Sequence, residues 1–99
     1  MTLQVQKVLA VFLTEPDEDR YGLEVRRTAG LKSGVLYPIL ARLENAGWLT
    51  SGWEDIDAHS DGRRPRRYYH LTTAGAVAGR DALARTAAVI TPSLGWRPV

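Results

Sequence analysis

The chain has 99 residues, which is the length of a single domain. Its 13 basic and 11 acidic residues leave a net charge of +2, which excludes a histone-like polycation, and its 44% hydrophobic content excludes a disordered tail. The chain contains no cysteine, which excludes disulfides, thiolate metal sites and a cysteine nucleophile.

The first predicted element is a helix over residues 2–14. Apolar residues recur there with the spacing of one helical face, at Val5, Val8, Leu9, Phe12 and Leu13. Further apolar side chains lie off that face and provide more apolar surface than one core contact needs: Leu3, Ala10 and Val11. The helix is therefore expected to bury one face in the core and to offer a second surface elsewhere.

A second, shorter helix is expected after a turn. Pro16 ends the first helix, because the residue before a proline is pushed out of the α region. The second helix should run from about Arg20 to Ala29, with Asp19 as its N-cap and Gly30 as a left-handed C-cap. The connection to the next helix is then only a few residues long.

The third predicted helix begins at Ser33 as N-cap and ends near residues 45–47. Its apolar residues again have helical spacing: Leu36, Ile39, Leu40 and Leu43. Pro38 does not fit this pattern, because a proline past the first turn removes an intrahelical hydrogen bond. Either the helix begins later than Ser33 or its first turn is irregular.

The period of the pattern then changes from helical to extended. Residues 48–56 and 67–71 are rich in aromatic and β-favouring residues, and the polar segment 57–65 between them contains Gly62 and Pro65. These residues predict two strands joined by a long loop. A last helix should begin at Thr72 or Thr73 and continue to about residue 90, with an apolar stripe at Leu83, Ala87 and Ile90.

This order of elements is typical of a winged helix, a mainly α (α+β) fold with a helix-turn-helix, a two-stranded β wing and a C-terminal helix. In such a fold the second helix of the helix-turn-helix enters the DNA major groove. The alternative is a winged-helix protein-interaction module that does not recognise DNA, and the polar residues Ser33, Tyr37 and Arg42 argue against it. The expected division of the chain is a DNA-binding domain at 1–75, a dimerisation helix at 76–90 and a tail at 91–99.

Three stretches carry a more specific signal: 21–25 (YGLEV), 33–49 (SGVLYPILARLENAGWL) and 62–75 (GRRPRRYYHLTTAG). Together they resemble the PadR family of bacterial winged-helix transcriptional regulators, over about residues 3–80. The resemblance accounts for Pro38, which the family carries at that place, and implies a homodimeric regulator, which we expect to be a repressor. The chain departs from the family at Val35, where threonine is common, and resembles the short members that have a single helix after the wing.

The third helix supplies the predicted major-groove element. Small residues at its start let backbone N–H groups approach a phosphate closely, and Tyr37 can donate a hydrogen bond to one. Arg42 can bind a phosphate or a guanine edge. In the alternative interpretation, Ser33 only caps the helix and Arg42 is only a solvated charge. The predicted contacts of this element are Lys32, Ser33, Gly34, Tyr37, Pro38 and Arg42.

The expected wing concentrates positive charge beside a glycine and a proline. A hairpin tip of this kind can lie along the DNA backbone or reach into the minor groove. Alternatively, the arginines pair with Asp57 and Asp61 in a solvated loop, and Arg67 already belongs to the strand. The predicted contacts outside the third helix are Arg63, Arg64 and Arg66 in the wing and Tyr21 on the second helix.

The acidic part of the wing has the residue types of a metal site without its spacing. Asp55, Asp57, His59 and Asp61 alternate, but Gly62 is misplaced for a calcium loop and no glutamate closes it. We expect a solvated loop that balances the arginine charge, and no metal or other cofactor. No catalytic triad order, glycine-rich phosphate loop or pair of buried carboxylates can be argued, so we expect a protein that is not an enzyme.

The two terminal helices carry the surplus apolar surface, so two chains are expected to pair through them. The expected dimer contacts are Leu3, Ala10, Val11, Leu83, Ala87 and Ile90. Trp96 is expected to pack on a partner chain, on the chain's own core or in a pocket for a small-molecule effector, in that order. No run of 18 apolar residues and no basic segment before an apolar stretch occurs, so we expect neither a membrane span nor a secretory signal, and a cytoplasmic location.

Overall fold

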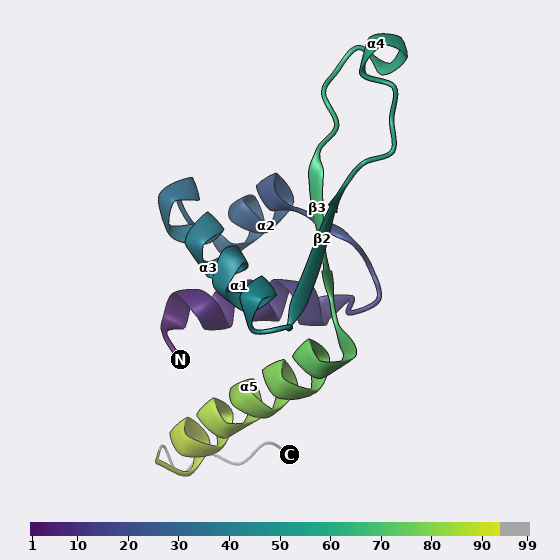
Figure 1. Cartoon of the computed structure of the whole chain (residues 1–99). Coiled ribbons are helices and arrows are strands. Elements are labelled where there is room, and N and C mark those ends of the chain that lie inside the picture. The colour runs from purple at the N-terminus through teal and green to yellow at the C-terminus, as the bar shows by residue number, and fades with distance from the viewer. Residues whose placement is uncertain (94–99) are drawn as a thin grey trace.

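The computed structural model describes the backbone of residues 1–93 and the side chains of residues 1–86. Three helices form a compact body, a hairpin rises from it, and a long last helix leaves it on the opposite side (Figure 1). The elements in chain order are α1 (Leu3–Thr14), β1 (Arg20–Tyr21), α2 (Gly22–Ala29), α3 (Ser33–Asn45), β2 (Leu49–Trp53), α4 (Ala58–Asp61), β3 (Arg67–Leu71) and α5 (Thr73–Ser93). This arrangement confirms the expected winged helix.

One hydrophobic core joins α1, α2 and α3 to the sheet. Its largest fully buried side chains are Phe12, Leu9, Leu36, Leu40, Leu49, Val8 and Val25. All four apolar residues predicted for the inner face of α3 are buried, as their helical spacing indicated. The core therefore holds α3 by one face and leaves the opposite face outside.

Val11 on α1 corrects one expectation. Its side chain is only 6% exposed and belongs to the chain's own core, because α2 packs against α1 on that side. Leu3 is 63% exposed and Ala10 is exposed, as expected for residues off the core face. The helix thus buries a wider face than the pattern suggested, and its surplus apolar surface excludes Val11.

The start of α2 also differs from the prediction. The N-cap is Tyr21 and not Asp19, and the Glu24 carboxylate accepts a hydrogen bond from the Tyr21 N–H at 3.3 Å. Asp19 instead lies 3.0 Å from Nδ1 of His70. Arg20 and Tyr21 are not helical, because they pair with β3 as a short third strand. The end of α2 is as predicted, with Gly30 in the left-handed region at φ 68°.

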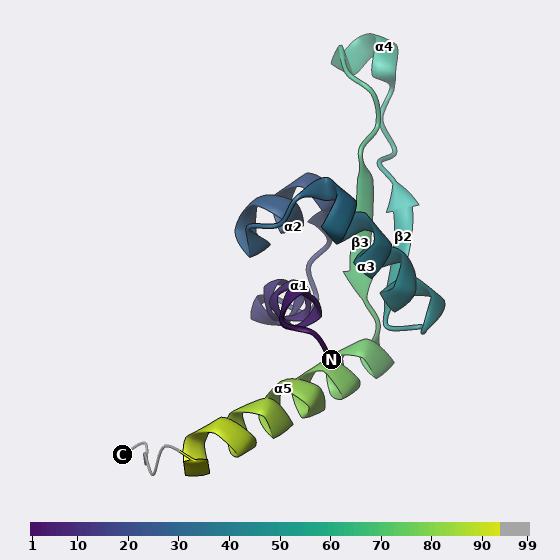
Figure 2. The same ribbon diagram turned by 90° about the vertical axis from the view of Figure 1, so that its left-hand side faces the viewer.

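The sheet has the strand order β1-β3-β2 and is antiparallel throughout. It therefore has three strands, one more than the expected two-stranded wing. In the register of the hairpin Ser51 pairs with Tyr69 and Trp53 with Arg67. Beyond Trp53 the hairpin opens into the wing tip, which carries the short helix α4 (Figures 1 and 2). Asp57 caps α4 by accepting hydrogen bonds from the His59 N–H and the Ser60 hydroxyl, each at 3.0 Å.

Helix α3 resolves the question raised by Pro38. The helix begins at Ser33, the N-cap is Lys32, and Pro38 lies inside the helix. The proline therefore costs the carbonyl of Gly34 its intrahelical partner, close to the helix start. Neither Ser33 as a cap nor a later start is correct.

Helix α5 begins as predicted and ends later than predicted. The Thr72 hydroxyl accepts a hydrogen bond from the Gly75 N–H at 2.9 Å, which identifies Thr72 as its cap. The helix continues to Ser93, so the first residues of the expected tail are helical. Only the first half of α5 lies against the body, and the second half projects away from it (Figure 2). Within the described residues, no helix is both long and apolar enough to cross a membrane.

Candidate nucleic-acid interface

The outward face of α3 displays the residues predicted to contact DNA. Because four apolar residues anchor the inner face, the opposite face is exposed to solvent. Tyr37 is 43% exposed, and Val35 beside it is also exposed. The predicted major-groove residues are all exposed: Lys32, Ser33, Gly34, Tyr37, Pro38 and Arg42. Four of these residues, Lys32, Ser33, Tyr37 and Arg42, have polar side chains that can donate hydrogen bonds to DNA.

The start of α3 is open to close approach by a ligand. The first N–H groups of any α-helix have no intrahelical acceptor, and they carry the positive end of the helix dipole. A side chain at Gly34 would meet no other atom within 4 Å, so the space over this turn is free in the described structure. A phosphate could therefore reach the backbone here.

Tyr37 connects α3 to the start of α2. Its hydroxyl lies so close to Gly22 that a Cβ atom at Gly22 would be 2.9 Å away. A hollow of about 190 Å³ opens at this junction, and β3 forms its third wall. The residues that line it are Tyr21, Gly22, Leu23, Tyr37, Arg66 and Arg67. Three residues predicted separately from distant parts of the sequence, Tyr21, Tyr37 and Arg66, thus meet around one hollow.

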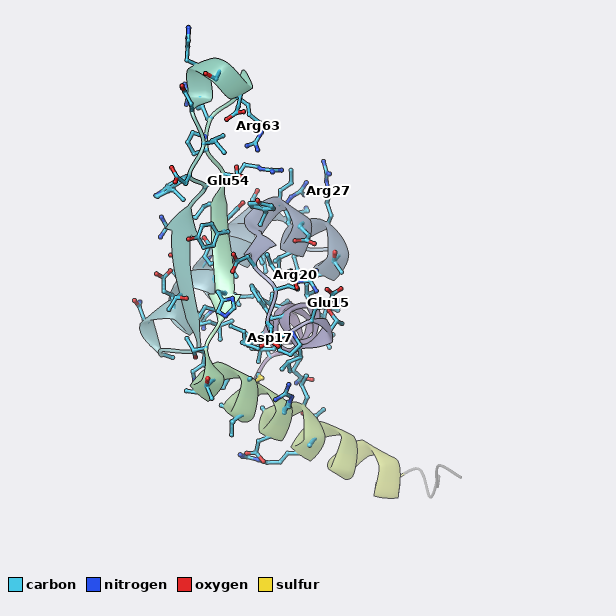
Figure 3. The ribbon with its side chains drawn as sticks, turned by 90° about the vertical axis from the view of Figure 1, so that its right-hand side faces the viewer. Glu15, Asp17, Arg20, Arg27, Glu54 and Arg63 are labelled. Carbon is cyan, nitrogen blue, oxygen red and sulfur yellow. The ribbon has the colours of Figure 1, made fainter. Side chains whose placement is uncertain are left out.

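Glu54, which the sequence analysis did not single out, organises the base of the wing. Its carboxylate accepts hydrogen bonds from both terminal nitrogens of Arg63, at 2.6 and 3.2 Å. It also accepts two hydrogen bonds from Arg66, one from the backbone N–H at 2.8 Å and one from Nε at 3.1 Å. A further hydrogen bond comes from the Tyr21 hydroxyl, at 2.9 Å. Figure 3 shows Glu54 and Arg63 on the wing, above the body that holds Arg20.

The electrostatics of this cluster follow from its contacts. Hydrogen bonds from Arg63 and Arg66 hold the pKa of Glu54 far below its usual range, and its side chain is only 10% exposed. The hydrogen bond to Glu54 raises the pKa of Tyr21, and the same carboxylate raises the pKa of both arginines. The Arg66 guanidinium also lies 4.1 Å over the Tyr21 ring, in a cation–π contact. All four groups are therefore locked in their ordinary protonation states near neutral pH.

The wing arginines differ in their surroundings. Arg63 and Arg66 pair with Glu54, and not with Asp57 or Asp61, which are the partners in the alternative interpretation of the wing. Arg64 is exposed and offers its carbonyl oxygen to Arg63 at 3.3 Å.

Arg67 belongs to strand β3, as expected. It donates a hydrogen bond to the Ser51 hydroxyl at 2.7 Å, and its guanidinium lies 5.2 Å over the Trp53 ring. Ser51 in turn donates to the Glu44 carboxylate at 2.8 Å, which links the strand to α3. Arg67 therefore has partners within the sheet, whereas Arg64 faces solvent.

The role of Glu54 could be predicted from the sequence only if the register of the hairpin were also known. Trp53 pairs with Arg67, so the next residue on one strand faces the residue before Arg67 on the other. That places Glu54 opposite Arg66, and the Glu54 N–H donates to the Arg66 carbonyl at 2.9 Å. The sequence alone leaves several acidic residues in this segment as equal candidates.

The residues expected to mediate dimerisation lie on two helices. Leu3 and Ala10 are exposed on α1, and Leu83 is partly exposed on α5. The side chains of Ala87 and Ile90 lie outside the described residues. Ala10 also borders an apolar hollow of about 350 Å³ between α1 and α2.

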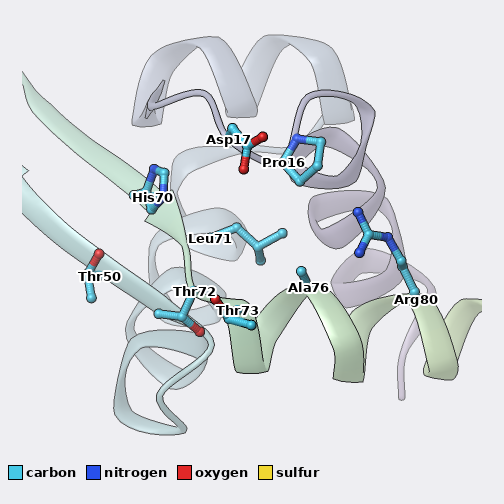
Figure 4. Close-up of a pocket in the computed structure, with 9 residues that line it drawn as sticks. All are labelled: Pro16, Asp17, Thr50, His70, Leu71, Thr72, Thr73, Ala76 and Arg80. Carbon is cyan, nitrogen blue, oxygen red and sulfur yellow. The ribbon is translucent and has the colours of Figure 1, made fainter.

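A third hollow, of about 530 Å³, lies between the sheet, the start of α5 and the turn after α1 (Figure 4). It is lined by Pro16, Asp17, Thr50, His70, Leu71, Thr72, Thr73, Ala76 and Arg80. None of the described lining residues is a Trp, Tyr or Phe. Trp96 itself lies outside the described residues. Among the residues with described side chains, no three His, Asp or Glu gather as a metal site would require.

Comparison with known proteins gives a family and a fold. The family model of the transcriptional regulator PadR-like family matches residues 8–81. A PadR-family transcriptional regulator from Eggerthella lenta DSM 2243 has 26% identity and a TM-score of 0.69, over 94% of this chain and 82% of that one. A protein from Streptococcus mutans UA159 has 26% identity and a TM-score of 0.68, over 98% and 92%.

A third structure supports the fold alone. The PcaV transcriptional regulator from Streptomyces coelicolor, in complex with its natural ligand, has 22% identity and a TM-score of 0.75 over 96% of this chain and 62% of that one. No curated protein matches the chain at a significant level.

The fold and its polar, basic face define a winged-helix DNA-binding protein. Within that class, the chain belongs to the PadR-like family of transcriptional regulators. Membership in this family confirms the expectation of a DNA-binding regulator of transcription rather than an enzyme.

Proposed function

We propose that the protein is a homodimeric repressor that recognises specific double-stranded DNA in the cytoplasm. In this proposal α3 enters the major groove, and the wing lies along the backbone of the same site. Repression requires only that the protein occupies its DNA site, because a protein bound across a promoter excludes other proteins from the same stretch of DNA.

The observation that carries the proposal is the convergence of Tyr21, Tyr37 and Arg66 on one hollow beside the exposed face of α3. These residues come from β1, α3 and the wing. Tyr37 and Arg66 can donate to a phosphate, whereas the Tyr21 hydroxyl already donates to Glu54 and its ring holds Arg66 in a cation–π contact. Such donors place a helix in register on the duplex, and side chains such as Arg42 then distinguish base edges. Lys32, just before α3, and Arg64, in the wing, are exposed and add further positive charge.

The dimer in this proposal uses the terminal helices. Leu3 and Ala10 on α1 are exposed and Leu83 on α5 is partly exposed, so both terminal helices carry uncovered apolar side chains. A two-fold axis through such a contact would bury both surfaces at once. It would also present two copies of α3 to successive major grooves, about 34–36 Å apart.

The test is selection of duplexes from a random pool by the purified protein, followed by titration of the selected duplex and a scrambled one. We expect a palindromic selected sequence whose half-sites are about one helical turn apart, and tighter binding than to the scrambled duplex. A pool that shows no enrichment, with equal affinity for all duplexes, would overturn sequence-specific binding. A reporter gene placed behind the selected site then tests the sign of regulation, and a rise in expression on adding the protein would overturn repression.

A further inference from the structure

Glu54 is an acidic side chain at the base of a surface that we assign to a polyanion. An exposed carboxylate in this place would repel phosphate, and a substitution that removed it would strengthen binding to any DNA. Glu54, however, is only 10% exposed, and its carboxylate accepts bonds from three residues in two parts of the fold. The negative charge of Glu54 is therefore balanced by hydrogen bonds within the protein rather than exposed to DNA.

The two arginines bind Glu54 without using all of their donors. Arg66 offers Nε and one terminal nitrogen to the carboxylate, and a guanidinium has five N–H groups. The Arg63 and Arg66 side chains remain 43% and 51% exposed. Each guanidinium can therefore bind Glu54 with one edge and a phosphate with another, so the carboxylate orients both cations without occupying them fully.

The third partner of Glu54 connects the wing to the helix-turn-helix. The Tyr21 hydroxyl donates to Glu54, and Tyr21 is the N-cap of α2. The next residue, Gly22, lies against the Tyr37 hydroxyl of α3. The chain of contacts from Glu54 through Tyr21 and Gly22 to Tyr37 thus sets the position of the wing relative to α3.

We propose that Glu54 is a positioning residue for specific DNA binding, which holds Arg63 and Arg66 in the geometry that lets the wing and α3 contact one site together. This inference rests on the proposed function. Arginine side chains lose much rotamer freedom when they bind a phosphate. Glu54 restricts them before DNA arrives, and it holds the wing in register with α3. The opposite role, a competitor that shields the arginines from phosphate, predicts the opposite change in affinity.

The test compares Glu54→Gln with Asp55→Asn. Both substitutions raise the net charge by one and keep the size of the side chain, and Asp55 is an exposed neighbour in the same segment. The selected and scrambled duplexes are titrated by fluorescence anisotropy at several salt concentrations. We expect Glu54→Gln to weaken binding to the selected duplex about tenfold, the loss of one well-placed contact, while binding to the scrambled duplex stays equal or tightens. Asp55→Asn should leave the ratio of the two affinities unchanged.

Tyr21→Phe provides an independent variant that keeps the carboxylate. Tyr21→Phe should also lower the ratio of the affinity for the selected duplex to that for the scrambled duplex. When it is combined with Glu54→Gln, the ratio should fall no further, because both substitutions act through one contact. Thermal unfolding of each variant identifies any loss of the fold, and Tyr21→Phe tests the inference if Glu54→Gln does not fold.

Two results would overturn the positioning role of Glu54. Tighter binding of Glu54→Gln to both duplexes would assign it as a competitor. An unchanged ratio of the two affinities, with a wild type that does prefer the selected duplex, would reduce Glu54 to a structural contact. A wild type with no preference at all would overturn the proposed function together with this inference, so the two failures are distinguishable.

Discussion

The Glu54 carboxylate lies between two guanidinium groups and a phenol, and each of these contacts favours its charged form. Hydrogen bonds from Arg63 and Arg66 stabilise the carboxylate more than its partial burial destabilises it, so its pKa falls. A glutamate in the unfolded chain titrates at its ordinary pKa of 4.5. The folded state therefore binds the proton of Glu54 more weakly than the unfolded state does.

This difference predicts a specific dependence of stability on pH. Because the pKa of Glu54 is lowered on folding, its contribution to stability is fully present above pH 4.5 and is lost as the pH falls through the folded pKa. The thermal midpoint of the wild type should exceed that of Glu54→Gln at pH 7, and the gap should shrink below pH 4.5. Differential scanning fluorimetry at a series of pH values measures both midpoints. A gap that is constant from pH 7 to pH 3 would show that the charge of Glu54 contributes nothing to stability.

Gly34 allows the stability of α3 to be separated from its function. Nothing lies within 4 Å of a Cβ atom at Gly34. A Cβ atom at Gly79 in α5 would make ordinary contacts with Leu13, at 3.4 Å, and Leu9, at 3.7 Å. Replacing either glycine by alanine in a helix should stabilise the fold by about 0.4–1 kcal/mol, because the unfolded chain loses freedom.

The two alanine variants should differ in DNA binding. Gly34→Ala places a methyl group where a phosphate would approach the start of α3, so it should weaken DNA binding although the protein becomes more stable. Gly79→Ala lies far from α3 in the fold and should bind DNA as the wild type does. Urea denaturation and anisotropy titration provide the two measurements. Equal DNA affinity of both variants would show that no phosphate approaches Gly34.

The wing and α3 are expected to contribute to DNA binding in different ways. The wing arginines meet phosphates, which every DNA sequence has, whereas the exposed face of α3 meets base edges. Arg63 and Arg64 lie on the side of the hairpin that leads from the tip back to β3, and Arg42 lies on α3. Substitutions in the wing should therefore change the salt dependence of binding, and substitutions on α3 should change the preference for the selected duplex.

Replacing Arg63 and Arg64 together by alanine should weaken binding to the scrambled duplex as well as to the selected one, because both duplexes lose phosphate contacts. Each lost phosphate contact removes about 0.9 from the slope of log K against log salt, so the slope should flatten by up to about 2 units. Arg42→Ala should instead reduce the difference in binding free energy between the selected and the scrambled duplex by about 1–3 kcal/mol. Titrations at several salt concentrations measure both effects. A double variant that keeps the full slope would assign both arginines to the protein's own ion pairs and solvent.

The whole molecule is elongated, because α5 leaves the body and continues to Ser93 (Figures 1 and 2). Its first half packs on α1, where Gly79 lies beside Leu9 and Leu13. A long helix that covers the body with only half of its length has surface left for a second chain, which is the basis of the proposed dimer.

Sedimentation velocity tests this assembly. We expect the wild type to sediment with twice the mass of one chain at micromolar concentrations, and Leu3→Asp with Leu83→Asp to shift it to the monomer, because each places a charge in an apolar contact. Val77→Asp is a matched control on α5 at a position outside the proposed contact. A wild type that remains monomeric, both free and on the selected duplex, would contradict the dimer.

The sequence by itself determined the four longer helices, the hairpin and the family, but neither β1 nor the short helix α4. Periodic apolar residues, Gly30 and Thr72 are local signals, and local signals decide where a helix lies because its hydrogen bonds join residues four apart. The α3 and wing motifs identified the family for the same reason: they are contiguous. The structure confirmed the buried face of α3 and the left-handed conformation of Gly30.

Only the tertiary structure decided which residues meet across the fold. Arg20 and Tyr21 form a strand because β3 offers them a partner, although their local pattern favours a helix. Val11 is buried because α2 packs over it. Glu54 binds Tyr21, 33 positions away along the chain, because the antiparallel register of β2 and β3 carries it there. Contacts of this kind depend on strand register and packing direction, which no local pattern in the sequence specifies.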